Sequence, residues 1–200
     1  MSEDAVVAAL RAGLPVILPT DTVYGLCASA DGAEPTAGLY ALKGRDASKP
    51  SALLAADVEQ LLACVPELDG VAHAVVRALL PGPYTLVLPN PARRYPWLTG
   101  TTPEAIGVRV PVLPAACARV LAAAGAVAAT SANPAGGADP RSVEDLDAEL
   151  REHVAAILDA GPLPGTPSTV LDLTGPEPRV LREGAVPADE ALARVADARR

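Results

Sequence analysis

The sequence predicts an α/β fold in which helices pack around an open mixed sheet. Segments with helical periodicity alternate along the chain with short apolar runs that are typical of buried strands. Half of the 200 residues are hydrophobic, which is enough for one sizeable core. The last two expected strands are joined by a tight turn instead of a helix, so the sheet contains antiparallel pairs. We therefore expect one domain over residues 1–200, with its motif-bearing core at about 14–186.

The first third of the chain contains two helices and two strands. Residues 3–11 form an amphipathic pattern that begins after a serine cap and stops at Gly13. The apolar run 16–18 follows as a buried strand. A helix over 35–43 has a proline in its first turn and a glycine directly after it. A short strand is expected at 52–55.

The middle of the chain continues the alternation. Helices are expected at 57–64 and 70–80, and the Pro-Gly-Pro sequence at 81–83 ends the second of them. The run 84–88 is rich in β-branched and aromatic side chains and predicts a strand. A further strand is expected at 106–110.

The last third contains two more helix and strand pairs, followed by a hairpin. An alanine-rich helix is expected first, then a strand, then a longer polar helix and another short strand. A Thr-Gly-Pro-Glu turn separates the last two strands. In order, these elements are expected at 115–124, 126–129, 142–153, 155–158, 169–173 and 180–182.

Composition and charge narrow the kinds of function. The net charge is −8 and there are only five aromatic residues, which argues against a dedicated nucleic-acid binder. Cys27, Cys64 and Cys117 are widely spaced and odd in number, so neither a disulfide framework nor a zinc ribbon is expected. A reducing cytoplasm fits these cysteines. The acidic N-terminus is unlike a secretion signal, and the most apolar run, 115–129, is too short to span a membrane.

Polar groups follow or interrupt several of the expected strands. Residues 19–22 (Pro-Thr-Asp-Thr) follow the first strand, and 130–133 (Thr-Ser-Ala-Asn) follow the strand at 126–129. Arg109 interrupts an otherwise apolar strand, where its guanidinium must be paired or face a cleft. Ligands of open α/β sheets bind at strand ends, so these groups indicate a pocket for a polar, anionic ligand. The alternative is that they only cap turns and form structural ion pairs.

The two lysines indicate where an anion would bind. The chain has fourteen arginines but only two lysines, Lys43 and Lys49, and both lie within four residues of Arg45. A compact ammonium group beside a guanidinium is well matched to phosphate or carboxylate. Lys43 could instead only close a helix, because the last turn of a helix favours cations.

Other polar features are less specific. Arg182 ends a strand as Arg109 does, and Ser168 precedes a strand after the Gly/Pro-rich loop 161–167, which is either a lid or a plain linker. The basic-aromatic stretch 93–97 is expected to be a solvated loop with at most a weak contact to RNA. Neither His73 nor His153 is expected to be catalytic. The familiar glycine-rich nucleotide motifs are missing, so a bound nucleotide would be held in another way.

In their order along the chain, seven motifs resemble those of the YrdC/TsaC family of L-threonylcarbamoyladenylate synthases, in its short, single-domain form. The motifs are Pro-Thr-Asp-Thr-Val-Tyr-Gly-Leu at 19–26, Lys-Gly-Arg at 43–45, Pro-Gly-Pro-Tyr-Thr-Leu-Val-Leu at 81–88, Val-Arg-Val-Pro at 108–111, Thr-Ser-Ala-Asn at 130–133, Ser-Thr-Val-Leu-Asp at 168–172 and Leu-Arg-Glu-Gly-Ala at 181–185. The resemblance implies a twisted open mixed sheet with a concave, positively charged groove. It also implies conversion of L-threonine, bicarbonate and ATP to threonylcarbamoyl-AMP and pyrophosphate, with Mg²⁺ accompanying ATP. Partner proteins would then transfer the threonylcarbamoyl group to tRNA.

The resemblance also assigns expected roles to residues. Lys43 and Arg45 would be catalytic and face the phosphates and the threonine carbamate. Threonine would be held by Thr20, Thr22, Arg109 and Ser168, and the nucleotide by Arg45, Lys49, Ser131, Asn133 and Arg182; no protein metal site is expected. Three positions depart from the family pattern: Asp46 replaces a proline, Leu54 a histidine of longer relatives, and Asp139 a hydroxyl residue.

Two alternatives to this synthase remain open. One is a non-catalytic RNA-binding or ribosome-associated module that uses the same groove. The other is a relative that acts on a different carbamoyl substrate. The acidic charge and few aromatics count against the first alternative, and the intact Lys-x-Arg and Ser-x-Asn pairs count against an inactive relative.

Overall fold

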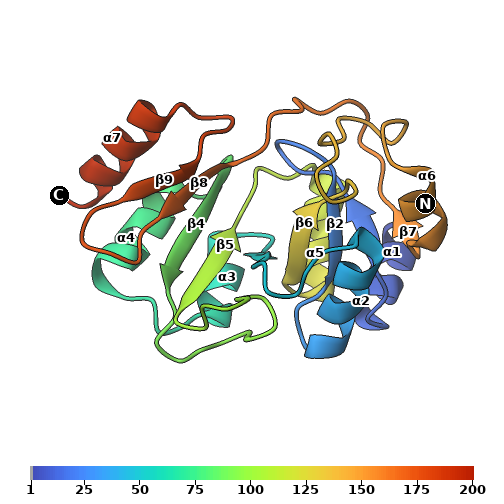
Figure 1. The fold of residues 1–200 in the computed structure, drawn as a ribbon, viewed down its shortest axis with the longest axis horizontal. Helices are drawn as coiled ribbons and strands as arrows, with labels where there is room; N and C mark the ends of the chain where they lie inside the picture. The colour runs from blue at the N-terminus through green and yellow to red at the C-terminus, as the bar shows by residue number, and fades with distance from the viewer. Residues whose placement is uncertain (1) are drawn as a thin grey trace.

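The computed structural model describes residues 2–200, which form a nine-stranded mixed sheet with helices around it (Figure 1). The strands are β1 (Val16–Leu18), β2 (Gly25–Ser29), β3 (Ala52–Leu54), β4 (Tyr84–Pro89), β5 (Ala105–Arg109), β6 (Val127–Ser131), β7 (Ala156–Ile157), β8 (Thr169–Asp172) and β9 (Arg179–Arg182). The helices are α1 (Glu3–Arg11), α2 (Ala33–Lys43), α3 (Val58–Cys64), α4 (Gly70–Leu79), α5 (Ala115–Ala124), α6 (Ala148–His153) and α7 (Ala188–Ala198).

The mixed sheet predicted from the sequence is confirmed. Its order is β7-β1-β2-β6-β3-β5-β4-β8-β9. Three pairs are parallel (β1 with β7, β3 with β5, β4 with β8) and the other five are antiparallel. The last of these is the expected hairpin of β8 and β9, which a short turn connects.

Three elements differ from the expectation. Strand β2 and helix α7 were not predicted. The helix expected at 142–153 was wrong in its first half, since helix α6 begins only at Ala148. The carboxylate of Asp145 accepts hydrogen bonds from the backbone N–H groups of Arg141 and Ser142, at 3.0 and 2.9 Å, which closes a turn there. Asp147 then caps α6 by accepting from the N–H of Glu149.

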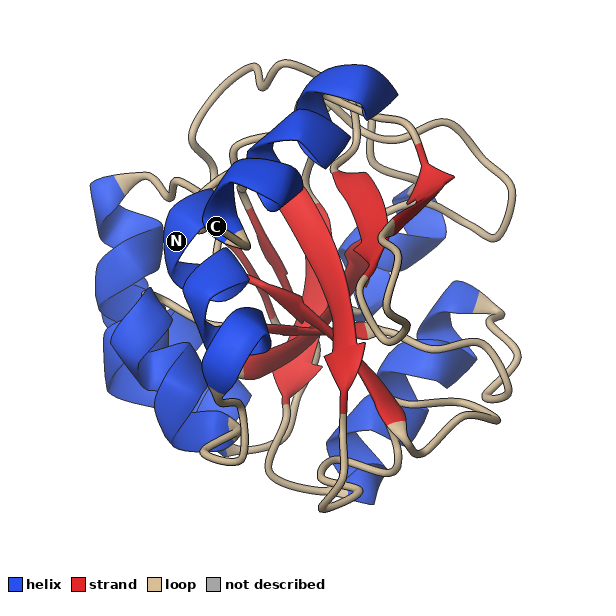
Figure 2. Ribbon diagram, turned by 90° about the vertical axis from the view of Figure 1, so that its left-hand side faces the viewer, coloured by secondary structure: helices blue, strands red, loops and turns tan. Residues whose placement is uncertain are grey.

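Helices cover one face of the sheet along its length but cover the other face only in part. Buried side chains of α2, α3, α4, α6 and α7 share one hydrophobic cluster with the strands, whereas those of α1 and α5 belong to a second cluster. The second cluster includes residues of β1, β2, β6 and β7 but none of β4, β5, β8 or β9 within the described residues. Figure 2 shows the twisted sheet with helices on both sides.

Strand alternation explains what the uncovered part of the sheet presents. Along β5, Ile106 and Val108 are buried in the first cluster, while Gly107 and Arg109 point to the opposite face. β4 alternates in the same way, with Leu86 in the core and its neighbours on the other side. The half of the sheet that α1 and α5 leave open therefore forms the floor of a cavity.

No helix within residues 2–200 has both the length and the apolar character required to cross a lipid bilayer.

Candidate active site

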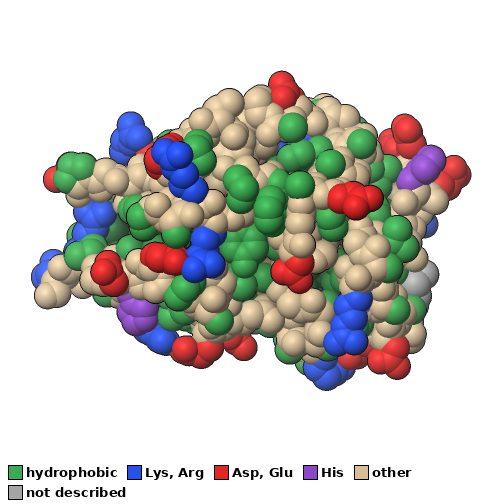
Figure 3. Space-filling view, turned by 90° about the horizontal axis from the view of Figure 1, so that it is seen from below, with side chains coloured by type: hydrophobic (Ala, Val, Ile, Leu, Met, Phe, Trp, Pro, Cys, Tyr) green, Lys and Arg blue, Asp and Glu red, His purple; other side chains and the backbone are tan. Residues whose placement is uncertain are grey.

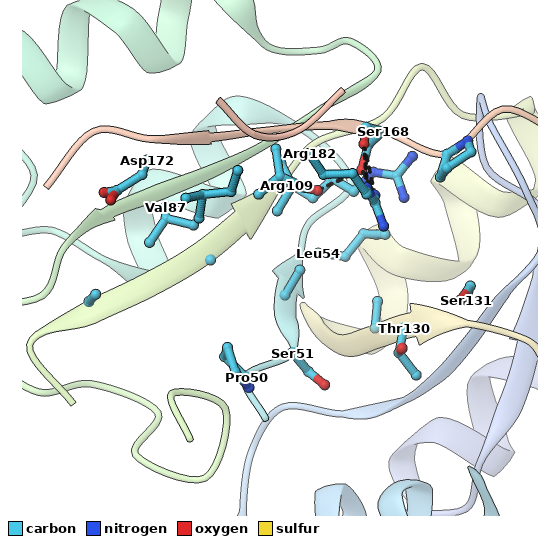
Figure 4. A pocket seen from close by; sticks show the side chains of 18 of the residues that line it. Pro50, Ser51, Leu54, Val87, Arg109, Thr130, Ser131, Ser168, Asp172 and Arg182 are labelled. Atoms are coloured by element: carbon cyan, nitrogen blue, oxygen red, sulfur yellow. Dashed lines mark hydrogen bonds between the residues drawn. The ribbon is translucent and has the colours of Figure 1, made fainter. Parts of the chain in front are cut away.

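A cavity of about 560 Å³ lies over the uncovered half of the sheet (Figure 4). Its floor is made by alternate residues of β3, β4, β5 and β8, which are the positions that point away from the first hydrophobic cluster, together with residues 129–131 at the end of β6. Arg45, Arg109, Ser131 and Arg182 all line it, although they are far apart in the sequence. The convergence that the polar strand ends predicted is thus present in the structure.

A second, smaller cavity of about 200 Å³ adjoins the first. The two share Arg45 and Ser131. The rest of the small cavity is lined by the other residues around the Lys-x-Arg and Ser-x-Asn motifs: Lys43, Gly44, Asp46, Lys49, Asn133, Ala135, Gly136 and Gly137. The two motifs therefore face each other across one small space, open to the larger cavity through Arg45 and Ser131.

Lys43 is the last residue of α2, and the left-handed conformation of Gly44 (φ 62°) ends the helix there. The side chain turns inward, so Lys43 is only 6% exposed. Its Nζ donates to the main-chain oxygen of Ser131 at 2.5 Å, to Thr130 Oγ1 at 3.0 Å and to Asn133 Oδ1 at 3.0 Å. All of these acceptors are neutral, and no carboxylate within residues 2–200 forms an ion pair with Lys43.

The surroundings of Lys43 make its charge easier to lose than usual. Burial and, to a lesser extent, the neighbouring charge of Arg45 together lower the pKa of Lys43 to about 8, while Asp139 acts in the opposite direction. An anion placed in the small cavity would supply the charge partner that the protein leaves out. This site can therefore stabilise phosphate-like charge next to Arg45.

Arg45 lines both cavities. Its Nη2 donates to the main-chain oxygen of Pro50 at 2.6 Å, which fixes the direction of the guanidinium. Its Nε is buried and has no partner among the described residues. A ligand oxygen is the natural acceptor for such a group.

The loop between β1 and β2 holds the Arg109 guanidinium on the side away from the large cavity. Its Nη2 donates to Asp21 Oδ1 at 2.8 Å and to Thr22 Oγ1 at 2.5 Å. The other carboxylate oxygen of Asp21 accepts from the N–H of Val112 at 3.1 Å, so Asp21 also ties this loop to the segment after β5. Burial lowers the pKa of Arg109, and Asp21 opposes that shift. Because Arg109 and Thr20 line the large cavity but Asp21 and Thr22 do not, the latter two support the guanidinium from outside it.

Ser168 and Arg182 meet at the top of the cavity (Figure 4). The Nη2 of Arg182 donates to the main-chain oxygen of Ser168 at 2.7 Å and to its Oγ at 3.2 Å. Ser168 Oγ also lies 2.8 Å from Thr85 Oγ1 of strand β4. This group was only partly anticipated, since the sequence did not single out Thr85.

The loop 161–167 is tied to the rest of the chain at several points. The N–H of Leu163 donates to Arg141 O at 2.7 Å, and the N–H of Gly165 donates to Thr22 O at 2.8 Å. The N–H of Ala185 donates to Pro167 O at 2.8 Å. These bonds make the loop a strap that links the loop after β1 to the segment after β9, which favours the linker interpretation over a freely moving lid.

The remaining predicted features lie elsewhere. The side chains of Arg93 and Arg94 form ion pairs with Glu104 and Glu67, and neither arginine lines a cavity described above. His73 accepts a hydrogen bond from Arg77, and neither His73 nor His153 lines either cavity. At the far end of the large cavity, Asp172 pairs with Arg179, an ion pair that the sequence did not suggest.

Comparisons with known proteins agree on one family. The family model Sua5_yciO_yrdC, described as "Telomere recombination", matches residues 8–184. A putative threonylcarbamoyl-AMP synthase of Mycobacterium tuberculosis is 37% identical over 181 residues, which are 90% of this chain and 82% of the relative. The crystal structure of Pyrococcus abyssi Sua5 complexed with L-threonine is 31% identical with a TM-score of 0.83; the match covers 97% of this chain but only 58% of that longer one. The structure of E. coli YciO is 26% identical with a TM-score of 0.82, over 96% of this chain and 94% of that one.

Proposed function

The chain belongs to the Sua5/YciO/YrdC family, and from this we propose that it is a threonylcarbamoyl-AMP synthase that uses L-threonine, bicarbonate and ATP. The observation that carries the proposal is the convergence of Arg45, Arg109 and Arg182 on one cavity, with Lys43 beside it. The curated relatives that carry this name, and the threonine in the P. abyssi structure, support the same activity. A cytoplasmic location belongs to the proposal, since Cys27, Cys64 and Cys117 are unpaired.

The reaction proceeds in two stages. The amine of threonine combines with bicarbonate to give a carbamate and water. A carbamate oxygen then attacks the α-phosphorus of ATP, the bond to the β-phosphate oxygen breaks, and pyrophosphate leaves. Charge increases on the phosphoryl oxygens during this step, and Lys43 and Arg45 stabilise it. The enzyme contributes positioning and electrostatics, so this step requires no histidine base.

In this proposal, one group of residues holds threonine and another holds the nucleotide. Arg109, with Thr20 and Ser168, holds threonine, and Thr22 acts through Arg109 because it lies outside the cavity. Ser131, Asn133, Lys49 and Arg182 hold the nucleotide. The product then passes to proteins that transfer the threonylcarbamoyl group to tRNA.

We propose that Mg²⁺ enters as part of the nucleotide substrate. Within residues 2–200 no group of three or more His, Cys, Asp or Glu side chains is arranged to hold a metal ion. A triphosphate supplies several oxygen ligands to Mg²⁺ by itself, and Mg²⁺ keeps several waters when it binds. The protein residues around the small cavity are cationic or neutral apart from Asp46, which matches a site for phosphate oxygens better than a site for a bare cation.

The test is to incubate the purified protein with ATP, bicarbonate and each amino acid in turn, and to detect AMP-linked products by mass. We expect threonylcarbamoyl-AMP with threonine. Lys43→Ala or Arg45→Ala should reduce pyrophosphate release that depends on threonine and bicarbonate by about 100-fold or more. Arg93→Ala, outside both cavities, is the matched control. Near-normal turnover in both site variants, or a product formed only with another amino acid, would refute the assignment.

A further inference from the structure

The hydroxyl of Ser168 lies in a short chain of donors and acceptors that extends beyond the residues assigned above. Ser168 lines the large cavity but is only 3% exposed. Its Oγ receives a hydrogen bond from Arg182 Nη2 at 3.2 Å and lies 2.8 Å from Thr85 Oγ1. The bond between the two hydroxyls can run in either direction.

Hydrogen-bond chemistry limits the directions that remain when an anion is bound. A guanidinium only donates, so Arg182 occupies one acceptor position of Ser168 Oγ. If Thr85 also donates to Ser168, both acceptor positions are filled and the Ser168 O–H must point to another acceptor. A carboxylate or carbamate oxygen only accepts. An anion in the cavity therefore selects the arrangement in which Thr85 donates to Ser168 and Ser168 donates to the ligand.

The backbone holds Thr85 in place for this role. Thr85 lies on β4, directly opposite Val170 of the parallel strand β8, and the N–H of Thr169 donates to Pro83 O at 3.0 Å. Its Cγ2 lies over Gly107 of β5, because a Cβ added to that glycine would meet Cγ2 at 3.9 Å. A β-branched side chain has few rotamers, so the Thr85 hydroxyl is held close to Ser168.

We propose that Thr85 is a positioning residue for threonine: its hydroxyl fixes Ser168 as a hydrogen-bond donor to an anionic oxygen of the substrate. This inference rests on the proposed function. It assigns a role to Thr85, a residue of the motif at 81–88, and this role is exerted through Ser168.

The experiment compares Thr85→Val, which keeps the shape but removes the hydroxyl, with Thr85→Ser, which keeps the hydroxyl. In the valine variant we expect the KM for threonine to rise about tenfold, as for loss of one hydrogen bond to a charged group, while the KM for ATP stays within about twofold. The serine variant should stay within about threefold of the wild type. Thr36→Val is the matched control, since the Thr36 side chain is also shielded, its hydroxyl donates to Gly32 O, and neither residue lines either cavity.

A second variant separates an indirect role from direct contact. In a Ser168→Ala background, Thr85→Val should cause no further rise in the KM for threonine, because its effect passes through Ser168. Any of three results would overturn the inference. These are a full tenfold rise in the KM for threonine in the Ser168→Ala background, an unchanged KM for threonine in Thr85→Val alone, or a tenfold rise in Thr85→Ser. If the wild-type protein forms threonylcarbamoyl-AMP and Thr85→Val keeps a normal KM for threonine, only this role of Thr85 is refuted. Wild-type protein that makes no threonine-dependent product would refute the proposed function as well.

Discussion

Lys43 keeps its ammonium group in a place where the protein supplies only neutral oxygens. Burial lowers its pKa to about 8, so below that pH the folded protein carries a poorly solvated charge and above it the charge is lost. The unfolded chain holds this proton up to about pH 10.5, so the cost of burying the charge is relieved as pH rises from about 8. Stability and activity therefore respond to pH in opposite directions at this residue.

We expect kcat/KM for ATP to fall above about pH 8, because the free enzyme loses the Lys43 charge there. Saturating MgATP should move the fall in kcat to higher pH, since the triphosphate stabilises the ammonium. A pH profile of pyrophosphate release measures both effects. Lys49→Gln is the control, because it removes the exposed lysine of the same small cavity and should leave the position of the fall unchanged. A flat profile up to pH 10 would contradict the role of Lys43.

Asp21 and Arg109 form a buried ion pair in which each side chain is only 12% exposed. Removing one partner leaves the other charge buried without compensation. We expect Asp21→Ala to lower the free energy of unfolding in urea by about 3–5 kcal/mol, and Asp21→Asn by less because it keeps an acceptor for the N–H of Val112. Glu59→Ala, which breaks the exposed pair with Arg77, is the control and should change stability very little. Equal losses in the buried and exposed variants would show that the pair at Arg109 has no special importance.

At the scale of elements, the strap 161–167 and the end of β9 meet at Gly184. A Cβ on Gly184 would lie 2.2 Å from the oxygen of Pro167 and 2.6 Å from the carbonyl carbon of Ser168, both of which are backbone atoms. Close approach of two backbones therefore requires glycine here. The same contact keeps Ser168 at the cavity.

We expect Gly184→Ala to push the strap away from β9, to lower stability by about 1–3 kcal/mol and to raise the KM for threonine. Urea unfolding and threonine-dependent kinetics measure the two effects. Gly175→Ala in the β8–β9 turn is the matched control, since its Cβ would meet nothing closer than 3.9 Å. If both alanine variants behave like the wild type, the strap does not fix Ser168.

The sequence alone was sufficient to predict the helices and strands whose apolar patterns are strong and local. It missed β2 because Gly25–Ser29 is poor in the β-branched and aromatic residues that favour strands. On its other edge β2 pairs with β6, which lies far away in the chain. It missed α7, although Ala191 and Val195, four positions apart, are both fully buried.

The same limit applied to the site. Arg109 was identifiable because a lone cation in an apolar strand needs a partner. The partner Asp21 and the neighbour Thr85 became recognisable only from the packing of the loop after β1 and the pairing of β4 with β8. A sequence pattern shows which side chains are unusual, whereas their contacts depend on which strands become neighbours.

For the whole molecule, the incomplete cover of the sheet is what creates the site. α1 and α5 pack on the half around β1, β2 and β6, and the other half is left as the cavity floor. Motifs between residues 19 and 182 are brought together because β3, β5, β4 and β8 are neighbours in the sheet while their order in the chain differs. Replacing small residues of this floor with larger ones, as at Gly107, would fill the cavity before it disturbed the core on the opposite face.

Charge over the whole molecule decides between the synthase and an RNA-binding module. The net charge is −8, and on the face drawn in Figure 3 acidic and basic side chains are interspersed, with hydrophobic ones gathered near its middle. Such a surface neutralises few backbone phosphates at a time. The cations that do cluster, Lys43, Arg45 and Lys49, line a cavity of about 200 Å³, whose size matches a small anion far better than a nucleic-acid helix.

We therefore expect tRNA to bind with a Kd weaker than about 1 µM at 0.15 M salt, and to leave the rate of threonylcarbamoyl-AMP formation unchanged. Fluorescence anisotropy with labelled tRNA at 0.05, 0.15 and 0.2 M salt measures the affinity and its salt dependence. Pyrophosphate release with and without tRNA measures the effect on the reaction rate. Arg93→Ala/Arg94→Ala removes the basic side chains of the stretch 93–97, which lines neither cavity, and should change neither result, because the two arginines pair with Glu104 and Glu67. The RNA-binding module would be favoured by nanomolar tRNA binding that depends steeply on salt and is lost in this double variant. Such a result would locate the tRNA affinity on a surface that the synthase reaction does not use.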